Sequence, residues 1–425
     1  MADFVANNLF VLLAGLLVFT MTPSVGLLEL GELGEDFEEA SLLKVMLIVV
    51  IGLVVMAIVG FNTAFAPTVA NGLIGNPLYG AGLFLGALSA NAAGLISGVF
   101  WSMTPEYFGA GLTTGTYFLF ETSFAMVTLA LVGVVVLKKV KLQAFALFSV
   151  LYLVVIWNLP AAWIWNPTGW LYTMGVRDFA GGLVVHGAAG AAGLAILVEV
   201  WLEERKSGLK ESPQVPIKVD PARLTLSTLL LWVGWFGFNS GSVLAFDSSA
   251  TVVVVTTFLA AASGFISLVL VAYWRHRHNP GLFVMANGVL MGLIVITPLA
   301  GFVNPVSAIV LGLLAGPLFY ASEVFFGKRN WFTDPIGLLA GHFTGGIFGI
   351  LMIGFFTQSA FAAASGTAGL PNGILFGGGV DALHQLGIEV FGTMVVLAFA
   401  FALSFAAIRL ASAVFHGVLS SQTAH

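Results

Sequence analysis

The chain of 425 residues is strongly apolar, with 59% hydrophobic and only 8% charged residues, against about 25% charged in ordinary globular domains. This composition excludes a soluble domain and predicts an all-α protein that crosses a lipid bilayer many times. The sequence has no cysteine, which excludes disulfides and thiol chemistry, and the net charge of −5 is small. No feature points to nucleic acid as a partner.

Roughly 20 apolar residues are needed to cross a bilayer as a helix. The stretch 70–112 is apolar but broken by Gly and Pro, and we expect an ordered external loop there. The eleven predicted spans are 6–28, 43–66, 113–137, 142–163, 178–202, 223–245, 249–274, 281–301, 305–326, 337–357 and 382–413.

The basic residues predict the orientation of these spans. The clusters Lys138 to Lys141, Arg205 to Arg223, Arg275 to Arg277 and Lys328 to Arg329 all fall on one side, and Arg177 falls opposite. By the positive-inside rule, the amino terminus lies outside a cell (plasma or inner) membrane and the carboxy terminus in the cytoplasm. Residues 1–413 then form one membrane domain, followed by a short cytoplasmic tail, 414–425.

Two groups of carboxylates stand out beside the first and third spans. The acidic run from Glu29 to Glu39 follows the first span, and we expect a solvated cytoplasmic loop there, or else a docking surface for a basic partner. Glu121 lies inside the third span, so it should pair with another group or line a cavity.

One spacing occurs twice in the chain. Asp178 precedes His186 by eight residues, and Asp334 precedes His342 by eight residues, with glycines at matching offsets after each Asp. Asp178 is expected at the outer end of its helix and Asp334 at the inner end of its own. Eight residues of helix span about 12 Å, so both histidines reach the middle of a core of roughly 30 Å.

This arrangement predicts inverted five-helix repeats, residues 6–202 and 223–357, with the last helix outside the repeat. Gly190 and Gly346, one turn beyond each histidine, would let the two backbones approach. Two neutral imidazoles can share a hydrogen bond and pass a proton. The alternatives are two unrelated packing histidines or a metal site, and the metal site is poorly supported because no further ligand lies at that depth. We expect no metal and no cofactor.

The chain also resembles the ammonium transporter (Amt/Mep/Rh) family, closer to its Amt branch. The matching motifs cover nearly the whole chain. They are Met21-Thr22-Pro23, Phe120 to Ala125, Trp165, Asp178-Phe179-Ala180-Gly181-Gly182 with His186, Gly234-Trp235-Phe236-Gly237-Phe238-Asn239 with Gly241-Ser242, Ile296-Thr297-Pro298, and Asp334-Pro335 leading to His342.

The resemblance implies a homotrimer of eleven-helix subunits and no catalysis. It implies an outer ammonium-binding site of Phe124, Trp165 and Ser242, and a gate made by Phe124 and Phe238. His186 and His342 match the paired pore histidines of the family. Asp178 and Asp334 match structural acidic positions.

The function that the resemblance implies is recruitment of NH4+, its deprotonation, and conduction of NH3 with a relayed proton. The alternatives are a neutral NH3 or CO2 gas channel of the Rh kind, and an ammonium sensor whose pore is occluded.

Some positions depart from the family. Glu121, Ala162 and Gly337 stand where a glutamine, a histidine and an acidic residue are usual. The tail after Arg409 lacks the regulatory segment of bacterial and plant members, so we do not expect a PII-type regulatory partner.

Overall fold

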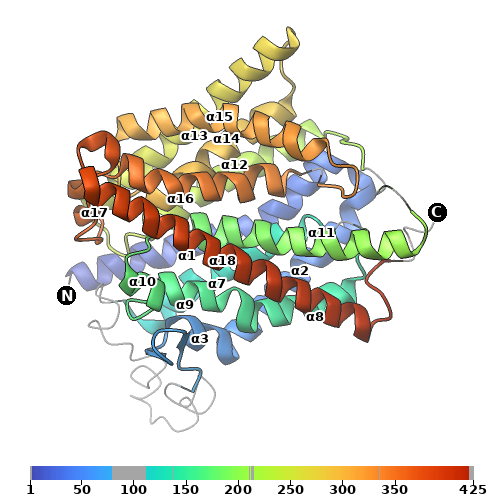
Figure 1. Ribbon diagram of the computed structural model, residues 1–425, viewed down its shortest axis with the longest axis horizontal. Coiled ribbons are helices and arrows are strands. Elements are labelled where there is room, and N and C mark those ends of the chain that lie inside the picture. Colours follow the sequence, from blue (N-terminus) through green and yellow to red (C-terminus); the bar gives the residue numbers. More distant parts are fainter. Residues whose placement is uncertain are drawn as a thin grey trace.

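A computed structural model describes residues 2–78, 112–136, 138–209, 211, 215–334 and 336–420. Long helices run side by side along the molecule, and the described chain begins and ends at opposite ends of the bundle (Figure 1). An odd number of membrane crossings leaves the two ends of a chain on opposite sides of the membrane. Of the expected external loop, residues 79–111 lie outside the described part of the chain.

The long helical segments follow the expected spans in order. They are α1 (Ala2–Leu33); α2 (Glu38–Val55), η2 (Met56–Gly60) and α3 (Phe61–Phe65); α7 (Thr114–Gly133); α8 (Leu142–Leu151), η4 (Tyr152–Ile156) and α9 (Asn158–Ile164); η5 (Gly182–Gly187) and α11 (Ala188–Lys206); α12 (Pro221–Gly241); α13 (Ser248–His276); α14 (Leu282–Ile296) and η6 (Thr297–Leu299); α15 (Pro305–Gly327); η7 (Leu338–Phe343) and α16 (Thr344–Phe356); and α18 (Gly379–Val414).

Short elements connect them. They are η1 (Glu35–Phe37), the two-residue strands β1 (Thr68–Val69) and β2 (Ile74–Gly75), α10 (Trp170–Met174), α17 (Ser359–Ala364) and η8 (Ile374–Phe376).

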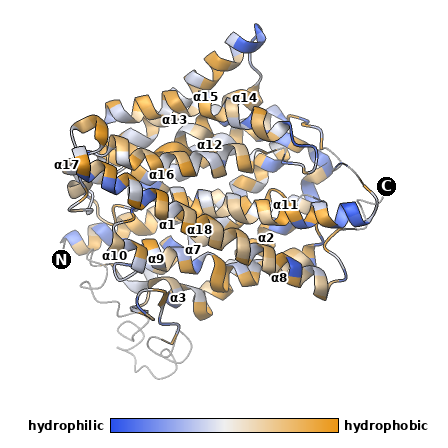
Figure 2. Cartoon of the chain, in the orientation of Figure 1, coloured by the Kyte–Doolittle hydropathy of each residue, from blue (hydrophilic) through white to orange (hydrophobic). Residues whose placement is uncertain are grey.

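Ten segments in the described part of the chain are long and apolar enough to cross a membrane. The remaining long helix, α12, has 21 residues, which is about 30 Å of helix, and it is less apolar because Asn239 and several hydroxyl side chains lie along it. Hydrophobic residues cover the lengths of the helices, while hydrophilic ones gather mainly toward the ends of the bundle (Figure 2). The predicted all-α polytopic fold is confirmed.

Helix α12 packs antiparallel against α1. An added Cβ on Gly31 would lie 2.6 Å from the Cα of Leu224, and one on Gly234 would lie 2.3 Å from Cγ of Met21. Residue numbers therefore rise along one helix as they fall along the other. The first helix of the first half thus runs opposite to the first helix of the second half, as inverted repeats require.

The two histidine-bearing segments are antiparallel as well. An added Cβ on Gly193 would lie 2.3 Å from a side-chain carbon of Leu338, and one on Gly346 would lie 2.3 Å from the carbonyl oxygen of Gly182. Glycine is needed at position 346 because a side chain there would collide with the backbone of the other segment.

The structure corrects one expectation about the acidic run after the first span. Helix α1 continues to Leu33, and Glu29 and Glu32 lie inside it, 1% and 0% exposed. The predicted solvated loop is therefore wrong for these two residues, whereas Glu35, Asp36 and Glu39 are exposed. A helix that is already hydrogen-bonded continues past polar residues when other helices pack around it.

Candidate functional site

Asp178 holds the start of the helix that carries His186. Its Oδ1 accepts hydrogen bonds from the backbone N–H groups of Gly181 and Gly182, and its Oδ2 accepts from those of Leu183 and Val184, at 2.7 to 2.9 Å. Gly181 turns the chain with a φ of 116°, a conformation that glycine adopts without strain. The carboxylate thus satisfies the N–H groups that the first turn of a helix leaves unpaired.

Asp334 starts the second histidine helix in the same way. Its two oxygens accept from the N–H groups of Leu338 at 2.9 Å and Leu339 at 2.8 Å, after Gly337 has turned the chain with a φ of 72°. Burial raises the pKa of Asp334 to about 6. The repeated spacing in the sequence therefore corresponds to a repeated capping structure.

The two histidines meet. Nδ1 of His186 lies 3.0 Å from Nδ1 of His342, and the ring centroids are 5.0 Å apart. One of these nitrogens must carry a hydrogen and the other must accept it. His186 is 1% exposed, and its Nε2 has no hydrogen-bond partner within the described residues.

Aromatic rings stack against His186. The ring of Phe238 lies 6.0 Å away at 13° and the indole of Trp235 lies 5.5 Å away at 28°. Nε1 of Trp235 donates to Oγ1 of Thr297 at 2.8 Å, which fixes the indole. The edge of the His186 ring, with its nitrogens, is therefore the polar part of a wall that is otherwise apolar.

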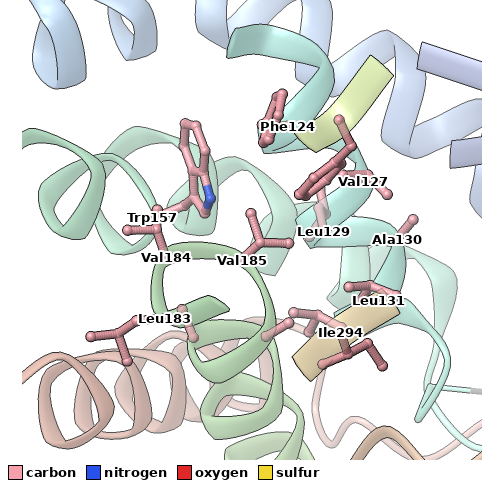
Figure 3. Close-up of a cluster of buried hydrophobic side chains, with 14 of the residues drawn as sticks. Phe124, Val127, Leu129, Ala130, Leu131, Trp157, Leu183, Val184, Val185 and Ile294 are labelled. Carbon is pink, nitrogen blue, oxygen red and sulfur yellow. The ribbon is translucent and has the colours of Figure 1, made fainter. Parts of the chain in front are cut away.

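A small cavity adjoins the histidine pair. It measures about 20 Å³, which is room for about one water-sized molecule. Figure 3 shows hydrophobic side chains of α7 and η5 around this region of the core, among them Val127, Leu131 and Val185. The full lining is Met21, Val25, Leu28, Val127, Leu131, Val185, His186, Leu231, Trp235, Phe238, Leu290 and His342.

Two phenyl rings close the passage on one side of the histidines. The ring centroids of Phe124 and Phe238 are 4.2 Å apart, and the two side chains are 1% and 0% exposed. Phe238 touches both Phe124 and His186. The rings therefore stand directly between the histidine pair and the space beyond Phe124.

That space is a vestibule of about 450 Å³. Phe124, Trp165 and Ser242 line it together, and so does Glu121. Nε1 of Trp165 donates to the carbonyl oxygen of Asp178 at 2.9 Å, so the capping aspartate also positions the indole. Oγ of Ser242 donates to the carbonyl oxygen of Phe238 at 2.9 Å, which leaves the hydroxyl lone pairs free to accept.

The structure thus brings the predicted residues into one continuous region. Phe124, Trp165 and Ser242 share the vestibule, Phe124 and Phe238 are in contact, and the two histidines touch. Asp178 also lines the vestibule, but its carboxylate oxygens are already bonded to backbone N–H groups.

Sequence reasoning missed part of the lining. The sequence motif around Phe238 does not by itself assign a role to Trp235, although Trp235 lies three residues before Phe238 and so on the same helix face. Met21 and Leu28, which lie on one face of α1, line the cavity as well. The residues that share one face of α1 with Met21, and one face of α12 with Phe238, could be identified from the helical spacing.

A many-helix membrane bundle with a vestibule, a ring constriction and a buried polar pair in an apolar passage belongs to the class of membrane transporters and channels for small substrates. The sequence profile described as Ammonium Transporter Family matches residues 9–423. The chain belongs to the ammonium transporter family, whose members are transporters rather than enzymes.

Known proteins agree with this assignment. The chain is 30% identical to the ammonium transporter of Bacillus subtilis (strain 168), over 96% of this chain and 92% of that one. It is 34% identical to ammonium transporter Amt1 of Archaeoglobus fulgidus, over 65% and 67% of the two chains.

Solved structures share the fold. A mutant of Candida albicans Mep2 superposes with a TM-score of 0.83 at 24% identity, covering 98% of this chain and 87% of that chain. A structure described as a sensor Amt protein gives a TM-score of 0.81 at 25% identity, covering 99% and 96%. The protein is therefore a multi-pass membrane protein of the ammonium transporter family.

Proposed function

We propose that the vestibule recruits NH4+, that the ion loses a proton at the ring constriction, and that NH3 and a relayed proton then pass the histidine pair. The observation that carries this proposal is the His186–His342 contact at 3.0 Å, in an apolar passage closed by Phe124 and Phe238.

The vestibule suits a small cation. The faces of aromatic rings attract cations, and Trp165 stands edge-on to Phe124 with centroids 5.8 Å apart. Ser242 can accept one N–H bond. Glu121 adds a carboxyl group to the same vestibule, which supplies a further hydrogen-bonding group. An uncharged gas would need none of these groups.

The passage beyond the rings favours the neutral form of the substrate. Moving an ammonium ion away from water into an apolar wall costs far more free energy than moving ammonia. His186 and His342 supply one donor and one acceptor there, and the unpartnered Nε2 of His186 has a hydrogen-bonding position left for the substrate. Proton transfer along the two imidazoles moves the positive charge past the centre of the membrane without moving an ammonium ion through it.

Two other functions predict different behaviour. A neutral NH3 or CO2 channel would move substrate without charge, and the cation-binding groups of the vestibule argue against it. A sensor would bind ammonium without transport. The likeness to a structure described as a sensor Amt protein makes this the second candidate.

The test is the current produced by an ammonium jump on a solid-supported membrane that carries the reconstituted protein. We compare the wild type with His186→Ala/His342→Ala. The matched control is His278→Ala/His384→Ala, which removes two exposed histidines. We expect a saturable wild-type current that only the pore double variant loses.

The other outcomes separate the alternatives. Ammonia flux without current, detected with an internal pH dye, would favour the gas channel. Neither current nor flux would favour the sensor.

We further propose that the vestibule faces the outside of the cell membrane, with the amino terminus outside and the carboxy terminus in the cytoplasm. The basic clusters of the sequence support this orientation. Residues 1–413 would form the membrane domain of each subunit of a homotrimer.

A further inference from the structure

The wall of the histidine cavity continues along α1 to a buried carboxyl group. Met21, Val25 and Leu28 line the cavity, and residues three or four apart lie on the same face of a helix. Glu32 is the next residue on this face, about 6 Å farther along the axis. It lies toward the end of the passage opposite the vestibule, because α1 meets the beginning of α12 there, at Gly31 and Leu224.

Glu32 is buried without a cationic partner among the described residues. It is 0% exposed, and neither carboxylate oxygen has a hydrogen bond within the described residues. Burying an ionised carboxylate without a partner costs many kcal/mol. This position therefore holds either a proton or a cation.

Polar side chains follow the cavity lining on two other helices as well. Asn287 lies one turn before Leu290 on α14, and Thr228 lies one turn before Leu231 on α12, and both are buried. Leu290 and Leu231 line the histidine cavity. On each of these helices a polar side chain thus follows the apolar lining of the cavity, and Asn287 is close enough to Glu32 to interact with it.

The charged groups that act on Glu32 are acidic. Asp334, Glu29 and Glu323 all repel a negative charge on it. The nearby cation Lys44 is bonded to both oxygens of Glu29 at 2.8 Å, so Lys44 is already neutralised. Among the described residues, the acidic surroundings of Glu32 are suited to a proton or a small cation.

Resting on the transport function proposed above, we propose that Glu32 is the proton-exchange group at the end of the passage opposite the vestibule. Its protonated carboxyl group meets ammonia that leaves the histidine pair. The carboxyl O–H bond breaks and an N–H bond forms, which gives NH4+ paired with the carboxylate. The ammonium ion then leaves for water.

The cycle closes with the proton that the next ammonium ion releases at the vestibule. The histidine pair passes this proton to the Glu32 carboxylate, which becomes protonated again. One ammonium ion has then crossed, and no group of the protein is consumed. Asn287 is placed to accept an N–H bond of the newly formed ion through its side-chain oxygen.

The experiment compares Glu32→Gln with Glu35→Gln, the same change at an exposed position three residues farther on. Currents and ammonia flux are measured on the same reconstituted vesicles. Because positioned acids contribute 10² to 10⁴ to proton-transfer rates, we expect Glu32→Gln to lower the current about a hundredfold. Ammonia flux should persist, and Glu35→Gln should behave as the wild type.

Infrared difference spectra of the purified protein, with ammonium chloride against potassium chloride, follow the carboxyl group directly. We expect ammonium to change a protonated-carboxyl band in the wild type and in Glu35→Gln, and the change to be absent in Glu32→Gln. Glu32→Asp, which keeps the carboxyl group, should retain the band change and part of the current.

The failures are distinguishable. A wild type without current means that the proposed transport function fails. A wild-type current that Glu32→Gln retains in full, or a band change that it retains, overturns the role of Glu32 alone. Loss of current and flux in both Glu32→Gln and Glu32→Asp, with the band change also lost in the Asp variant, would mean that Glu32 is structural and would overturn the inference as well.

Discussion

At the scale of residues, the two capping aspartates differ although their sequence positions match. Asp178 accepts from the N–H groups of four residues, while Asp334 accepts from two. Asp178 also fixes Trp165 through its carbonyl oxygen. The aspartate beside the vestibule therefore supports the architecture of the vestibule in addition to starting its helix.

We predict that Asp178→Ala lowers the free energy of unfolding by about 2 kcal/mol or more, because it leaves buried N–H groups without an acceptor. Asp247→Ala removes an exposed cap of α13 that accepts from Ser249 and Ala250, and should cost less. Thermal unfolding in detergent measures both. Wild-type stability and transport in Asp178→Ala would contradict the structural role.

Asp334 predicts a dependence of stability on pH. Burial raises its pKa from 3.8 to about 6, so the folded protein holds this proton more tightly than the unfolded chain. Its contribution to stability is present at low pH and is lost as the pH rises through about 6. We expect the unfolding temperature to fall between about pH 4 and about pH 6, and to fall less in Asp334→Asn.

The control for that measurement is Asp381→Asn, which removes an exposed carboxylate of α18. An Asp334→Asn variant with the same pH dependence as the wild type would show that Asp334 does not titrate in this range.

At the scale of elements, the site depends on how closely two antiparallel helices approach. An added Cβ on Gly346 would lie 2.3 Å from the carbonyl oxygen of Gly182 and 3.0 Å from Cβ of His186. Both histidines also lie in π-helical turns, η5 and η7. Such turns are rare and occur often at functional sites. Backbone geometry, as much as the imidazoles themselves, therefore determines the contact.

We predict that Gly346→Ala separates the helices and lowers transport strongly, because backbone atoms cannot move aside as a flexible side chain can. Gly387→Ala in α18 is the matched control, since an added Cβ there meets no atom within 4 Å. Ammonium-jump currents and thermal unfolding measure both variants. Equal currents in the two variants would contradict the prediction.

At the scale of the whole molecule, apolar side chains cover much of the outer surface. Large hydrophobic residues are exposed along α1, α2, α13, α15 and α18, whereas α7 and α11 are mostly buried. Such a surface requires lipid or further subunits around it. This property belongs to the bundle and not to any single helix.

We predict that the purified protein in mild detergent is a trimer, with a protein mass three times that of the chain. Light scattering combined with size-exclusion chromatography measures this mass. A monomer over the whole accessible concentration range would remove the support for the trimer.

Much of the fold could be predicted from the sequence, because a membrane limits the choice of structure. In hydrocarbon every backbone polar group must be bonded within its own segment, so a long apolar run has few alternatives to a helix. The repeated spacing of Asp178 to His186 and of Asp334 to His342 predicted that the histidines would meet. Periodicity alone could not place the end of α1, because Glu29 and Glu32 resemble residues of a loop.

Local pattern thus determined the number and order of the helices and the identity of the paired residues, since these depend on hydropathy and spacing along one chain. Tertiary structure decided which faces line the passage, because that depends on how several helices rotate against one another. Tertiary packing also buried Glu32, which continues the face of α1 that Met21, Val25 and Leu28 form. Residues of the distant segments α12, α14 and the Asp334 turn lie near this end of α1, and no stretch of sequence near Glu32 contains them.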